Sequence, residues 1–116
     1  MRVLVAYEND KRIYRDAVTL GIQHARPHVE ITVVDLQTLE EGVARFAPHL
    51  VICSPSIRVN PATICSSAWV VLSPYPERPS KICVEGERRE LLNPSLEDLI
   101  AVVDETERLV IGKPAH

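Results

Sequence analysis

The sequence lacks the features that would point to a membrane or to nucleic acid. No apolar run approaches the roughly 20 residues that a membrane-spanning helix needs. The net charge is only slightly acidic, at -3, and no block of lysines and arginines offers a surface for nucleic acid. We therefore expect neither a membrane nor nucleic acid as a partner.

Cysteine is also scarce. The chain has three cysteines, an odd number without a Cys-x-x-Cys pair, so the spacing of a zinc knuckle or a redox pair is missing. Two of them stand inside apolar runs, where a cysteine usually packs as a small hydrophobic residue. The apolar stretch at the amino terminus is too short for the core of a signal peptide. We expect reduced thiols and a cytoplasmic location.

Length and composition predict one domain. The chain has 116 residues, of which 46% are hydrophobic and 25% charged, and these values are typical of a globular protein with a real core. No repeat, linker or low-complexity segment divides it. Gly112 and Pro114 end the last helix, so we expect a domain over residues 1–112 and a tail over 113–116.

One short segment, Leu50–Cys53, organises the prediction. These continuous apolar residues follow Pro48 and stop at Ser54 and Pro55. A short apolar run between turn signals indicates a strand that is buried on both faces, as in the middle of a parallel sheet. Ligands of open parallel sheets bind just beyond the carboxyl ends of such strands, which is where Ser54 stands.

The first half of the chain alternates strands and helices. Apolar patterns predict strands over residues 3–6 and 29–35, and helical spacing predicts helices over 14–25 and 36–46. With the central strand, this gives a β-α-β-α-β pattern, which indicates parallel strands joined by right-handed crossovers.

The second half is less regular. Strands are predicted over residues 69–72 and 82–84, and the proline-rich segment 74–79 between them excludes a helix. With so short a connection, these two strands could pair antiparallel instead of through a crossover. A tight turn follows at residues 85–87.

The last helix has a start signal of its own. Ser95 and Asp98 stand at capping spacing, which predicts that the helix begins there. All elements together predict an α/β, three-layer sandwich of the flavodoxin-like kind. Its five-stranded, mainly parallel sheet would have the order 2-1-3-4-5, with the helices reduced in the second half.

Three stretches of the sequence resemble the receiver domain of bacterial two-component response regulators. In residues 2–18, an opening strand leads into acidic residues and an Arg-rich helix start. Residues 48–55 are similar to the family's Pro-Asp-Leu-Val strand. Residues 93–103 are similar to its Lys-Pro stretch and final helix.

The resemblance implies a phosphorylation pocket at the strand tips. In the family, two acidic residues hold Mg²⁺, an aspartate ending the third strand accepts the phosphoryl group, and a hydroxyl and a lysine bind the phosphate. Here Glu8 and Asp10, with Asn9 between them, can supply the acidic pair. Ser73 matches the hydroxyl.

Two departures from the family argue against phosphorylation of this chain. Ser54 stands where the family has the aspartate, and a neutral hydroxyl needs a nearby base before it can attack phosphorus. Asn93 replaces the lysine that would neutralise the phosphate. The predicted ligand-binding residues of this degenerate receiver pocket are Glu8, Asn9, Asp10, Ser54, Ser73 and Asn93.

Two local patterns have competing interpretations. Glu8 and Asp10 could form a weak, residual Mg²⁺ site, or they could simply favour the positive end of the following helix. Cys53 and Arg58 suggest a phosphatase loop, but their spacing is one residue short. No glycine lets backbone amides wrap a phosphate there, so a cysteine phosphatase is disfavoured.

Two functions are compatible with these patterns. The first is a non-catalytic signal-transduction module: a stand-alone, degenerate receiver that binds a protein partner, or a second copy as a homodimer, without aspartyl phosphorylation. The alternative is a sensor that binds a small ligand or a metal in the pocket at the carboxyl ends of the strands. We expect no enzyme activity and no cofactor apart from residual Mg²⁺.

Overall fold

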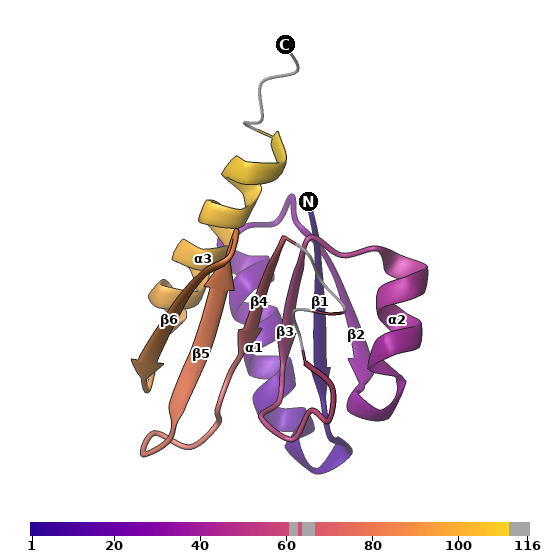
Figure 1. The fold of residues 1–116 in the computed structure, drawn as a ribbon, viewed down its shortest axis with the longest axis vertical. Coiled ribbons are helices and arrows are strands. Elements are labelled where there is room, and N and C mark those ends of the chain that lie inside the picture. The colour runs from indigo at the N-terminus through magenta and orange to yellow at the C-terminus, as the bar shows by residue number, and fades with distance from the viewer. Residues whose placement is uncertain (61–62, 64–66, 112–116) are drawn as a thin grey trace.

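A six-stranded mixed sheet forms the centre of the protein (Figure 1). The computed structural model describes residues 1–60, 63 and 67–111, so the predicted tail at 113–116 lies outside the described residues. The strands follow the order β2-β1-β3-β4-β5-β6 across the sheet. Their bounds are β1 Arg2–Tyr7, β2 Glu30–Asp35, β3 Leu50–Cys53, β4 Ala68–Val71, β5 Pro79–Val84 and β6 Glu87–Leu92.

Three α-helices accompany the sheet: α1 (Arg12–Ala25), α2 (Leu39–Phe46) and α3 (Leu96–Ile111). Two short 3-10 helices, η1 (Asn9–Lys11) and η2 (Leu36–Thr38), precede α1 and α2. β1 pairs in parallel with both β2 and β3, and β3 pairs in parallel with β4. The first half of the chain therefore has the predicted β-α-β-α-β arrangement.

The prediction of a five-stranded, mainly parallel, flavodoxin-like sheet is wrong. β5 pairs antiparallel with β4, and β6, which was not predicted, pairs antiparallel with β5. Glu85 and Gly86 link β5 to β6 with φ values of 52° and 81°, and positive φ at both central residues is what a type I′ hairpin turn requires. This two-residue turn leaves no room for a crossover helix.

Apolar side chains fill both faces of the sheet. On one face, α1 and α3 cover a cluster that includes Val5, Ile22, Ile52, Val70 and Val103. On the other face, α2 packs on β1 and β2. The cluster there extends to Trp69 of β4 and Cys83 of β5, but no helix in the described part of the chain covers that region.

The start of α3 confirms its predicted cap. The backbone amide of Asp98 donates to Ser95 Oγ at 3.1 Å, and the amide of Ser95 donates to Asp98 Oδ2 at 2.8 Å. The two side chains thus satisfy two amides that the first turn of a helix otherwise leaves without partners.

Tyr7 ties the end of β1 to the end of β4. Its side chain is fully buried, and its hydroxyl donates to the carbonyl oxygen of Leu72 at 2.7 Å. Its ring makes an edge contact with Tyr14, whose hydroxyl donates to the carbonyl oxygen of Ser73 at 3.3 Å. Burial raises the pKa of Tyr7 far above its ordinary value, so the hydroxyl stays a donor.

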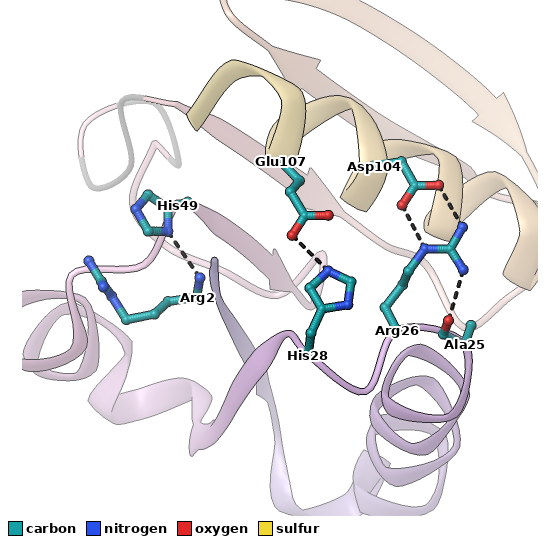
Figure 2. A network of polar contacts seen from close by, with 7 residues as sticks. All are labelled: Arg2, Ala25, Arg26, His28, His49, Asp104 and Glu107. Carbon is teal, nitrogen blue, oxygen red and sulfur yellow. Dashed lines mark hydrogen bonds and ion pairs between the residues drawn. The ribbon is translucent and has the colours of Figure 1, made fainter. Parts of the chain in front are cut away.

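Polar side-chain contacts fasten the end of α1 and the loop after it to α3 (Figure 2). Arg26 donates to Asp104 through Nε at 2.8 Å and Nη2 at 2.7 Å. Nε2 of His28 lies 2.8 Å from Oε2 of Glu107. The hydrogen bond from Arg26 lowers the pKa of the Asp104 carboxyl despite the opposing effect of burial.

The amino end of β1 is anchored in a similar way. The backbone amide of Arg2 donates to Nδ1 of His49 at 3.0 Å, and Nε of Arg2 donates to the carbonyl oxygen of Ala47 at 3.1 Å. Burial, together with the charges of Arg2 and the amino terminus, lowers the pKa of His49. The imidazole is therefore neutral at pH 7 and can accept this bond.

Replacing the Tyr7 hydroxyl should destabilise the fold. We expect Tyr7→Phe to lower the free energy of unfolding by about 1–2 kcal/mol, because a buried carbonyl loses its donor. Urea denaturation measures this change. Tyr14→Phe is the matched control, since it removes a longer and only partly buried bond and should cost less. Equal stability of Tyr7→Phe and the parent would contradict the role given to Tyr7.

The pair of Arg26 and Asp104 should make stability depend on pH. Because the pKa of Asp104 is lowered in the folded state, the pair stabilises the fold above the ordinary pKa of about 4 and stops doing so as the pH falls through the folded-state value. Arg26→Gln should lower the melting temperature at pH 7, and the difference from the parent should shrink below about pH 4. Arg45→Gln, which breaks an exposed pair with Glu41, is the control. A difference that does not change with pH would count against this interpretation.

Candidate functional site

A small polar cavity lies where β1, β3 and β4 end. We call it the strand-tip cavity. Its volume is about 140 Å³. Because these three strands are parallel, the segments that follow them meet at one edge of the sheet. The polar and charged side chains that line the cavity are Glu8, Lys11, Ser54, Ser56, Ser73, Tyr75 and Arg78.

Glu8 is the most unusual of these residues. Its Oε1 atom is buried and has no hydrogen-bond partner in the described part of the chain. Burial alone would raise the pKa of this carboxyl, but hydrogen bonding from the Ser54 hydroxyl, from the backbone amide of Glu8 itself and from the Ser56 hydroxyl, together with the charge of Lys11, lowers it below its ordinary value. Neither hydroxyl satisfies Oε1 itself. Glu8 is thus an ionised carboxylate with one oxygen that lacks a donor.

The two strand-end serines close turns. The hydroxyl of Ser54 accepts the backbone amide of Ser56 at 3.1 Å, and the hydroxyl of Ser73 accepts the amide of Tyr75, also at 3.1 Å. The amide of Ser73 in turn donates to Oγ of Ser80 at 2.9 Å. Such bonds give Ser54 and Ser73 a local structural role that is independent of any ligand.

Two cations stand against Tyr75. Nζ of Lys11 lies 5.6 Å from the centroid of the ring, and Cζ of Arg78 lies 5.8 Å from it. Hydrogen bonding to Tyr75 and the charge of Asp10 raise the pKa of Lys11, so it remains protonated. The cavity therefore combines two cations with the one carboxylate of Glu8.

Half of the predicted pocket residues line this cavity. Glu8, Ser54 and Ser73 meet there, as predicted, because they follow three adjacent parallel strands. Asn9, like Asp10, belongs to η1 and does not line the cavity. Asn93 does not line it either, because this residue follows β6, and β5 lies between β6 and β4 in the sheet.

The predicted acidic pair does not converge. The side chain of Asp10 is 74% exposed and contacts Lys11 at 3.4 Å, whereas Glu8 lines the cavity. Asp10 lies in the first turn of η1, which agrees with the alternative interpretation as a favourable charge at a helix start. Among the described residues, no group of three or more His, Cys, Asp or Glu could hold a metal ion. A weak Mg²⁺ site at Glu8 and Asp10 stays a prediction.

Sequence reasoning missed Lys11, Tyr75 and Arg78. Tyr75 and Arg78 belong to the proline-rich segment after β4, and the amide of Arg78 donates to the carbonyl oxygen of Tyr75 at 3.1 Å. This turn brings both side chains back over the strand tips. A rigid segment that carries an aromatic and a basic residue, directly after a strand at the ligand-binding edge, is the signal that could have identified them.

In comparisons with protein families, curated proteins and solved structures, nothing matches this chain. The resemblance to receiver domains therefore stays a prediction, and the mixed sheet departs from the five-stranded sheet that it implies. No helix within the described ranges is long and apolar enough to cross a membrane.

Proposed function

We propose that the protein is a binding module that senses a small ligand in the strand-tip cavity. The main support is Glu8, whose Oε1 atom is buried without a donor. Buried polar atoms are almost always satisfied, and an exception at a cavity indicates a missing water, ion or ligand group. Rotation about the last side-chain bond, which is a soft torsion, can turn this oxygen towards the cavity.

The charges of the cavity define the class of ligand. An ionised carboxylate can only accept hydrogen bonds, so Glu8 requires an ammonium, amide or hydroxyl group on the ligand. Lys11 and Arg78 favour a carboxylate or phosphate at the other end. The volume of about 140 Å³ is roughly five times the share of one water molecule in the liquid. A ligand of the size of a small amino acid or hydroxy acid fits this description.

The cavity also bears on the hypothesis of a signalling module. It occupies the place at which a degenerate receiver would have its pocket, and three of its residues belong to that predicted set. A regulatory protein that responds to a bound ligand is compatible with both hypotheses. The hydroxyl of Ser54 accepts the amide of Ser56, and its hydrogen bonding lowers the pKa of Glu8, so Ser54 helps to keep the carboxylate ionised for a ligand.

A ligand screen tests the proposal. We expect small amino acids, hydroxy acids or their phosphates to raise the melting temperature, because a ligand present at 100 times its Kd stabilises the folded state by about 2.7 kcal/mol. Mg²⁺ alone forms a separate arm, which tests the metal alternative. Calorimetry on Glu8→Gln should then show binding at least about tenfold weaker, a loss of about 1.4 kcal/mol.

The control for this screen is Glu77→Gln, which removes the same charge from an exposed residue that does not line the cavity. It should bind the ligand as the parent does. Failure of every compound to stabilise the parent, or equal affinity of Glu8→Gln and the parent, would refute a ligand site at Glu8.

A phosphorylation assay tests the family resemblance separately. After incubation with acetyl phosphate and Mg²⁺, we expect no gain of mass in intact-mass analysis, because the acceptor position holds the neutral hydroxyl of Ser54. A gain of one phosphoryl group that is lost in Ser54→Ala would show that a serine acceptor works here.

A further inference from the structure

We propose that two copies of the chain form a homodimer by pairing their β6 strands antiparallel, which joins two sheets into one. β6 is an edge of the sheet, beside β5 (Figure 1). Five of its six residues are exposed. No proline interrupts the strand, so all its backbone amides can donate. Such an edge is a template for another strand.

The hairpin geometry shows which backbone groups of β6 are available. In a hairpin with a two-residue turn, the flanking pair, here Val84 and Glu87, exchanges both hydrogen bonds, and bonded and non-bonded pairs then alternate. Pro79, which has no amide to donate, accordingly falls opposite Leu92 in a non-bonded pair. The amides and carbonyls of Arg88, Glu90 and Leu92 therefore point away from β5, towards the free edge.

The charges on these outward-bonding residues are self-complementary. In an antiparallel self-pair centred on Arg89, Arg88 of each copy stands directly opposite Glu90 of the other, in positions that exchange backbone bonds. Opposite charges that face each other across two strands stabilise the pairing. Both side chains are exposed, and within the described ranges neither forms an ion pair in the monomer.

Arg89, at the centre of this arrangement, is already paired with a carboxylate of its own chain. Arg89 would stand opposite Arg89 of the second copy, on the face that α3 covers. Its Nη2 already donates to both carboxylate oxygens of Glu105, at 2.9 and 3.0 Å. The repulsion between the two guanidinium groups is reduced accordingly.

The neighbouring register is less favourable. Centred on Glu90, it would place the two Glu90 side chains opposite each other and Arg88 opposite the apolar Leu92. Like charges that face each other directly are destabilising. Charged side chains at a sheet edge usually prevent association with other chains. On β6, the order of Arg88 and Glu90 favours pairing with a second copy of the same strand, in the register centred on Arg89.

Charge-reversal variants test the dimer by sedimentation equilibrium. With a monomer of 13.0 kDa, the parent should approach twice this mass as its concentration rises. Arg88→Glu alone and Glu90→Arg alone should each remain monomeric, because each places like charges opposite one another. The double variant, and an equimolar mixture of the two single variants, should dimerise again.

Two further variants separate the dimer from folding defects. Glu30→Arg makes the same charge change on β2, the opposite edge of the sheet, and should leave the dimer intact. Glu90→Pro removes one outward-pointing amide and should abolish the dimer without unfolding the chain, as circular dichroism can verify. A parent that is monomeric at every concentration, or a dimer that survives Arg88→Glu, would overturn the proposal. Neither result depends on ligand binding at Glu8.

Discussion

The arrangement at the carboxyl edge of the sheet depends on one buried hydrogen bond, from the hydroxyl of Tyr7 to the carbonyl oxygen of Leu72. It joins the ends of β1 and β4 across β3, a strand of four fully buried residues. Two backbone bonds join the same strand ends, from the amide of Ser54 to the carbonyl oxygen of Ala6 and from the amide of Leu72 to that of Cys53. Together, these bonds hold Glu8, Ser54 and Ser73 around one cavity, although the three residues are far apart in the sequence.

The strand-tip cavity contains one of two buried polar side-chain atoms in the described part of the chain that lack a hydrogen-bond partner, Oε1 of Glu8; the other is Nε of Arg89. A buried acceptor without a donor destabilises a protein by about 1–3 kcal/mol, or more when it is charged. Elsewhere the buried hydroxyls of Tyr7, Ser80 and Thr106 have partners. Departures of this kind from local satisfaction tend to occur at functional sites, which is why we assign the cavity, and not the better-packed core, to ligand binding.

The parallel strands and the start of α3 could be predicted from the sequence. The strand β6 and the two cations of the cavity could not, for physical reasons. The strands β1, β3 and β4 carry runs of buried apolar residues, β2 carries a β-branched run, and α3 carries a reciprocal cap at Ser95, so these elements leave clear patterns. β6 leaves none, because a mostly exposed edge strand needs no apolar alternation. Missing it placed Asn93 beside β4 instead of two strands away. Lys11 and Arg78 were not predicted to line the cavity, because the position of a long charged side chain depends on tertiary contacts. The periodicity of apolar residues in the sequence does not show such contacts.

Trp69 is the one tryptophan of the chain, so its intrinsic fluorescence comes from a single known position. The residue lies on β4, is only 6% exposed, and sits on the side of the sheet that α2 covers only in part. Its indole lines cavities that also include Lys81 and Arg88. Intrinsic fluorescence therefore reports on a single, central place in the sheet: its emission shifts to longer wavelength when β4 becomes exposed to water, with no second fluorophore of this kind to obscure the change.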